Sequence, residues 1–154
     1  MVRTLYRGLI AGAAGTVALD MVTYLDMAIR GRPASTTPQR TVRRLAEIVG
    51  VDLGEGERAE NRSAGIGALL GYATGLVVAL AYVGAARGPR PWPRAAGTLM
   101  AMAMVASNAP MTVLRVTDPR RWSAVDWVAD VVPHLAYGTV TAAVDNTLRS
   151  GEPR

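Results

Sequence analysis

The stretch DWVADVVPHLAYGTVTAAVD, Asp126–Asp145, decides how the rest of the chain is interpreted. Read as one helix, it places Asp126, Asp130, His134 and Asp145 on one stripe, because steps of about 100° per residue bring every fourth side chain back to nearly the same face. Most of the residues between them are Val, Leu or Ala. An acidic stripe with one His on an otherwise apolar helix indicates a membrane span that carries a polar site.

Three further apolar segments precede this one in the chain of 154 residues. Each is long enough to cross a hydrocarbon core about 30 Å thick at about 1.5 Å per residue. The sequence therefore predicts an all-α fold, an antiparallel bundle of four transmembrane helices with both termini on one side. We expect one integral membrane domain, residues 1–154, with spans at about 5–29, 63–85, 95–114 and 124–148.

The charged residues sit mainly between and at the ends of these segments. All 17 cationic residues are Arg, and the formal net charge is +5. They form no clustered basic face of the kind that binds nucleic acid, so we expect the lipid bilayer as partner and no nucleic acid. The chain has no Cys, which excludes disulfides and thiolate metal sites.

One short amphipathic helix is predicted in the polar connection after the first span. Thr37-Pro38 is typical of a helix start, and Gly50 is typical of a helix end. Between them, apolar and charged residues occupy different faces: Val42, Leu45, Ala46 and Val49 against Arg40, Arg43, Arg44 and Glu47. Two interpretations are open, a helix on the membrane surface with its Arg residues near lipid phosphates, or a helix packed over the mouth of the bundle.

Glycines at intervals of four residues predict close helix contacts. Gly8 and Gly12 form a small-xxx-small pair in the first span. Gly67, Gly71 and Gly75 form one smooth ridge in the second. We expect this ridge to contact another helix, either within the protomer or in a second protomer.

A depth estimate brings polar residues of three spans into one layer. At about 1.5 Å per residue from the same face, Asp20 lies about 13 Å inside, Asn108 and Asp130 about 9 Å, and His134 about 15 Å. Tyr137 borders the same stripe. The sequence therefore predicts an intramembrane polar cluster of Asp20, Asn108, Asp130, His134 and Tyr137.

This cluster has three interpretations. Carboxylates at membrane depth cost about 2.5–3.5 kcal/mol each on insertion scales, so they face inward and have partners or a role. In the first interpretation the site passes protons, cations or a small solute, since a His beside a buried carboxylate is suited to a relay. In the second, the hydrogen bonds only fix helix packing in an accessory or scaffolding membrane protein.

The third interpretation is a metal-dependent membrane enzyme. Asp126, Asp130 and His134, with Asp20 from the first span, offer oxygen and nitrogen ligands for Mg²⁺ or Mn²⁺. An Asp-x-x-x-Asp pair also occurs in membrane transferases of the CDP-alcohol type, but their preceding Asp-x-x-Asp-Gly is absent. No nucleophile elbow, P-loop or dinucleotide fingerprint occurs, so the sequence leans toward a non-enzymatic role, and it does not identify a cofactor. Asp145 is expected near the opposite interface.

Two phrases resemble a known family. RGLIAGAAGTVALD (Arg7–Asp20) and PHLAYGTVTA (Pro133–Ala142) are similar to small bacterial inner-membrane proteins of the YagU type, and His134, Tyr137 and Gly138 carry the His-x-x-Tyr-Gly part. The resemblance implies a multi-pass protein of the inner (cytoplasmic) membrane and implies no mechanism. One four-span protomer is small for a transporter, so we expect a homo-oligomer or a larger membrane complex.

Overall fold

The computed structural model describes residues 2–85, 88 and 90–151, and all regular structure in these ranges is helical. The helices are α1 (Val2–Arg30), α2 (Thr37–Val49), α3 (Gly56–Ala85), α4 (Trp92–Val113) and α5 (Ala124–Ser150), with a short 3-10 helix, η1 (Pro119–Arg121), before α5. The predicted all-α class is confirmed. Residues 1, 86, 87, 89 and 152–154 of the predicted domain lie outside the described residues.

The short helix predicted after the first span is present as α2. Gly50 ends it in the left-handed conformation, with φ 71°, and its N–H donates to the Ala46 carbonyl oxygen. Glycine is favoured at this position because it has no Cβ to clash there. Thr41, Val42 and Ala46 are the buried side of α2, which packs against α3.

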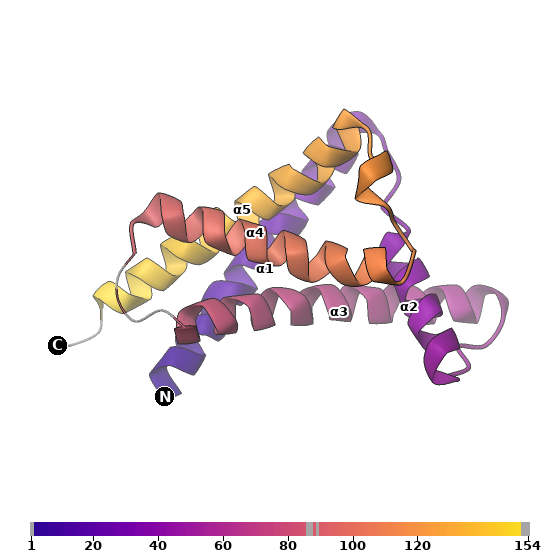
Figure 1. Cartoon of the computed structure of the whole chain (residues 1–154), viewed down its shortest axis with the longest axis horizontal. Coiled ribbons are helices and arrows are strands. Elements are labelled where there is room, and N and C mark those ends of the chain that lie inside the picture. The colour runs from indigo at the N-terminus through magenta and orange to yellow at the C-terminus, as the bar shows by residue number, and fades with distance from the viewer. Residues whose placement is uncertain (1, 86–87, 89, 152–154) are drawn as a thin grey trace.

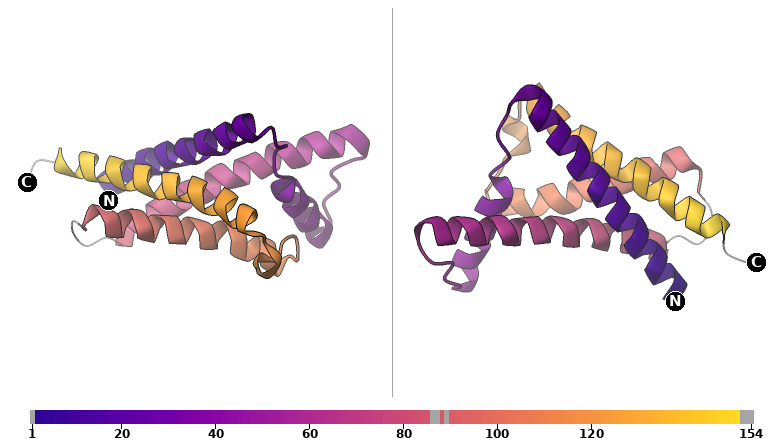
Figure 2. Two further views of the ribbon diagram at one scale, coloured as in Figure 1. Left: turned by 90° about the horizontal axis from the view of Figure 1, so that it is seen from above. Right: turned by 180° about the vertical axis from the view of Figure 1, so that it is seen from behind.

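The long helices form two antiparallel pairs that cross obliquely. Figures 1 and 2 show α1 and α5 side by side, running across α3 and α4. The main contacts join α1 to α5, α4 to α5 and α1 to α3, and fewer join α3 to α4. The sequence predicts an antiparallel bundle, but it does not predict these oblique crossings.

Small residues explain why α1 can cross α3 so closely. A Cβ on Gly12 would lie 2.8 Å from the Ala79 side chain and 3.2 Å from the Gly75 carbonyl oxygen. A Cβ on Gly8 would lie 2.8 Å from the Leu80 side chain. The predicted small-xxx-small pair of α1 therefore forms the face on which α3 packs, and the close approach sets the oblique crossing.

Two helices, α1 and α3, are long and apolar enough to cross a membrane. Among the described residues α4 and α5 do not meet this criterion; α4 contains Ser107, Asn108 and Pro110, and α5 contains three aspartates and His134. The prediction of four spans is thus not supported as a whole, and only two of the four segments have the length and apolar character of a span. The core helix of a water-soluble protein can have the same length and composition. The residues exposed on the outer faces of the helices distinguish the two cases.

Replacing Gly138 with Ala should destabilise the contact between α5 and α4. The added Cβ would lie 2.4 Å from the Ala96 carbonyl oxygen and 2.8 Å from the Met100 backbone nitrogen. Backbone atoms cannot rotate away, so we expect a loss of about 1–3 kcal/mol in the free energy of unfolding. The measurement is denaturant unfolding of the purified protein. Gly97→Ala on α4 is the control, since its Cβ meets no atom within 4 Å; equal losses for both variants would contradict the prediction.

Candidate functional site

Ser107, Asn108, Asp130 and His134 form a polar cluster between α4 and α5, here called the Asp130–His134 cluster. The Asn108 side-chain Nδ2 donates to Asp130 Oδ2 at 2.9 Å. The Ser107 Oγ lies 3.2 Å from His134 Nε2. His134 is buried and the other three side chains are half-buried. Two polar contacts therefore join α4 and α5 at this cluster.

The neighbours of His134 indicate which ring nitrogen carries its proton. Nδ1 lies 2.7 Å from the Asp130 backbone carbonyl oxygen and 3.5 Å from the Asp130 carboxylate Oδ1. Both oxygens accept only, provided that the carboxyl group is ionised, so Nδ1 is the donor. Nε2 is then the nitrogen that gains or loses a proton, and it faces the Ser107 hydroxyl.

Each of the two helices has a proline beside the cluster. Pro133 lies inside α5 between Asp130 and His134, and Pro110 lies inside α4 two residues after Asn108. Proline has no N–H, so the carbonyls of the residues four positions earlier lose their helical donor. The cluster is therefore flanked by backbone acceptors that regular helices do not offer.

Two predicted members of the cluster lie elsewhere. The half-buried Asp20 of α1 interacts with the Tyr72 hydroxyl of α3. Tyr137 is 1% exposed, and its hydroxyl donates to the Gly75 carbonyl oxygen of α3. The depth estimate gives the height of a residue along its helix but not the direction of its side chain around the axis. Of the five predicted residues, the structure thus brings together Asn108, Asp130 and His134.

The four candidate metal ligands are not brought together. The Asp126 carboxylate accepts hydrogen bonds from the backbone N–H and the hydroxyl of Ser123, at 2.9 and 2.7 Å, and so caps the start of α5. Asp20 faces Tyr72. In the ranges that the structure describes, no three His, Cys, Asp or Glu side chains are grouped so as to hold a metal ion.

A buried ion cluster between α1 and α5 was not predicted. Asp145 is only 3% exposed, although the sequence suggested an interfacial position. Its Oδ1 accepts from Arg7 Nε and Nη2, each at 2.9 Å, and its Oδ2 accepts from Arg149 Nη2 at 3.1 Å. The available signal was the antiparallel arrangement, which places the start of α1 beside the end of α5.

The glycine ridge of α3 serves two different contacts. A Cβ on Gly67 would lie 3.0 Å from Pro38, so this glycine allows α2 to approach α3. A Cβ on Gly75 would lie 2.2 Å from the Thr16 hydroxyl of α1. Gly71, between them, is exposed and meets no atom within 4 Å.

Comparison with known proteins gives no match: no family model, no curated protein and no solved structure is similar to the chain. The resemblance to YagU-type membrane proteins therefore stays a prediction.

Replacing Asp145 with Asn should destabilise the fold strongly. It removes the carboxylate from between Arg7 and Arg149 and leaves two cations close together in a buried place. Breaking a buried pair in this way costs about 3–5 kcal/mol of unfolding free energy. Glu47→Gln is the control, because its pair with Arg44 is exposed and such pairs contribute at most about 1 kcal/mol. Similar unfolding midpoints for both variants would show that the buried cluster does not stabilise the chain.

Proposed function

We propose that the protein is an integral membrane protein, and the exposed faces of its long helices carry this proposal. The outward side chains are large and aliphatic: Ile10, Val17, Met21, Leu25, Ile29, Leu69, Val77, Val105, Val113, Val128 and Val132. The buried positions include many small or polar residues: Ala11, Thr16, Ser63, Ala79, Ala96, Thr141 and Asp145. A water-soluble fold buries its large aliphatic residues, whereas lipid solvates them and leaves small residues for helix contacts.

All four long helices cross the bilayer in this proposal, with α2 at its surface. On α4, Val105 and Val113 are 65% and 81% exposed, and on α5, Val128 is 58% exposed. The acidic groups of α5 that would lie at membrane depth have polar partners, as membrane proteins require. A multi-pass protein of the cytoplasmic membrane with both termini on one side fits these faces and the YagU-type resemblance.

We further propose that the Asp130–His134 cluster exchanges a proton and serves the translocation of protons, cations or a small solute. The carrying observation is that His134 Nε2 and the Ala103 carbonyl oxygen compete for the single hydroxyl proton of Ser107. These acceptors lie 3.2 and 2.9 Å from its Oγ, and the Met104 carbonyl oxygen is a third, at 3.2 Å. The hydroxyl can satisfy only one of them at a time.

The cluster can therefore accommodate both protonation states of the imidazole. When His134 is neutral, the Ser107 hydroxyl donates to Nε2. When Nε2 gains a proton, it donates to Ser107 Oγ, and the hydroxyl turns to the Ala103 carbonyl. The positive charge then lies beside the Asp130 carboxylate, 3.5 Å from Nδ1, and Asn108 holds the other carboxylate oxygen.

A second candidate is an accessory or scaffolding membrane protein in which the cluster only holds α4 against α5. One observation favours it: Asn108, Asp130, His134 and Ser107 satisfy one another. Two surface pockets lie beside α2, and none of these four residues lines either of them. For either candidate we expect a homo-oligomer or a larger membrane complex, since one such protomer is small for alternating access.

The membrane location predicts how the protein behaves on extraction. We expect it to stay in the membrane pellet after washing with alkaline carbonate and to enter solution only with detergent. The physical reason is that aliphatic side chains on the outer faces of α1, α3, α4 and α5 would otherwise meet water. Release into aqueous buffer without detergent would contradict the proposal.

Proton exchange predicts that Asp130→Asn and His134→Gln abolish proton flux into vesicles that contain the purified protein. The flux, followed with a pH-sensitive dye inside the vesicles, should fall to that of protein-free vesicles. The reason is that each variant removes one of the two groups between which the charge is balanced. Unfolding of the same variants in detergent is measured in parallel.

Asp118→Asn is the matched control, because this partly exposed carboxylate caps η1 in the loop before α5. It should keep wild-type flux. If wild-type protein gives no flux above protein-free vesicles, the proton proposal is wrong. Loss of stability in both cluster variants would then favour the scaffolding candidate.

A further inference from the structure

A basic pocket lies between α2 and the end of α4. It has a volume of about 380 Å³ and is lined by four arginines, Arg40, Arg43, Arg44 and Arg115, with Glu47 and the apolar Leu114 and Val116. Three of the arginines come from the predicted amphipathic helix, and Arg115 comes from the turn after α4. Such an excess of guanidinium groups over carboxylates in a concave place favours an anion.

The charges in this pocket are only partly compensated. Glu47 is engaged by Arg44 at 2.8 Å, and Arg43 makes a long contact of 3.4 Å to Ser63. The guanidinium groups of Arg40 and Arg115 have no hydrogen bond or ion pair within the described part of the chain. These two cations border a cavity without a protein anion of their own.

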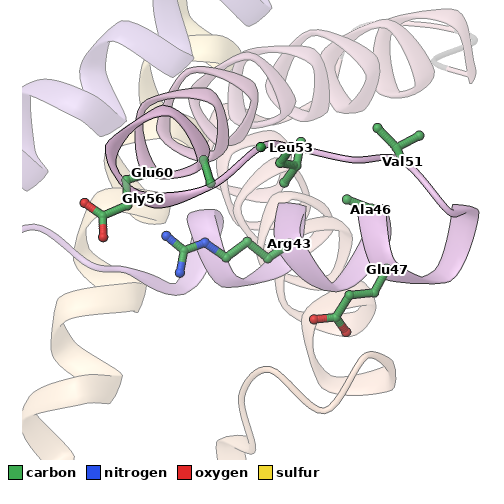
Figure 3. A pocket seen from close by; sticks show the side chains of 9 residues that line it. Arg43, Ala46, Glu47, Val51, Leu53, Gly56 and Glu60 are labelled. Atoms are coloured by element: carbon green, nitrogen blue, oxygen red, sulfur yellow. The ribbon is translucent and has the colours of Figure 1, made fainter.

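An adjacent pocket differs from the basic pocket in the charges that line it. It lies between α2 and the start of α3, and Arg43 is the only arginine among its lining residues, which also include two glutamates, Glu47 and Glu60 (Figure 3). Its charges are mixed, so it has no preference for an anion. The basic character is therefore specific to the side of α2 that faces α4.

The backbone conformation of Arg115 also favours a functional role for this residue. The turn is a Schellman motif, in which the Val116 N–H donates to Met111 O at 2.9 Å and the Arg115 N–H donates to Thr112 O at 3.0 Å. Arg115 occupies the left-handed position of this motif, with φ 57°, where glycine is usual. Among the described residues it is the only non-glycine with a positive φ, and such a strained position often marks a functional group.

We propose that this pocket binds the phosphate of an anionic phospholipid headgroup. Guanidinium groups form paired hydrogen bonds to phosphate oxygens, and Arg40 and Arg115 are free to do so from two different elements, α2 and the turn after α4. Leu114 and Val116 supply an apolar wall for the glycerol end of the lipid. The lipid thereby holds α2 to the end of α4. The inference rests on the proposed membrane location but not on the proposed proton exchange.

The test is thermal unfolding of the full chain in a neutral detergent, with dioleoyl phosphatidylglycerol, dioleoyl phosphatidylcholine or inorganic phosphate added. We expect phosphatidylglycerol to raise the unfolding temperature of the wild type more than the other two additions do. Arg40→Gln and Arg115→Gly should lose this extra rise. Arg120→Gln, an exposed arginine in η1 that does not line the pocket, should keep it.

Arg115→Gly separates binding from a purely structural role. Glycine relieves the backbone strain, so without lipid this variant should unfold at or above the wild-type temperature while its response to phosphatidylglycerol is lost. An unchanged response in Arg40→Gln and Arg115→Gly, or an equal loss in Arg120→Gln, would overturn the proposal. An equal rise with inorganic phosphate would overturn the lipid as its source. Carbonate extraction tests the membrane location separately, so failure of the pocket and failure of the location are distinguishable.

Discussion

The hydrogen bond from the Tyr137 hydroxyl to the Gly75 carbonyl oxygen lies at the point where α5 meets α3, and the rest of the arrangement depends on it. Tyr137 is almost fully buried, and a buried hydroxyl without a partner would cost about 1–3 kcal/mol. Gly75 itself leaves room for the Thr16 hydroxyl of α1. Three helices can meet here because Gly75 of α3 leaves room for both the Thr16 hydroxyl and the Tyr137 ring.

One turn of α5 connects this crossing to the polar cluster. His134 contacts Ser107 of α4, Tyr137 contacts α3, and Gly138 lies against the α4 backbone at Ala96. Residues three and four positions apart share one side of a helix, so these contacts are made together or not at all. The site that we propose for proton exchange is therefore held by the same turn that sets the packing of the core.

The two ends of the molecule treat charge differently. Between α1 and α5, Asp145 neutralises Arg7 inside the protein, which suits a place from which water is excluded. Around α2, Arg40 and Arg115 border an open pocket, where they are available to bind an anion from outside the protein. Charge inside the crossed helices thus stabilises the fold, while charge beside α2 is available to the surroundings.

Helix class and approximate helix bounds follow from the sequence alone, because the turn residues Thr37 and Gly50 and the apolar periodicity act within one helix. The proximity of Asn108, Asp130 and His134 also follows from the sequence, since a rise of about 1.5 Å per residue gives the position of each group along its helix axis. Only the tertiary structure turns Asp20 towards Tyr72 and buries Asp145. The rotation and crossing of helices depend on contacts between distant segments, and no single helix carries that information.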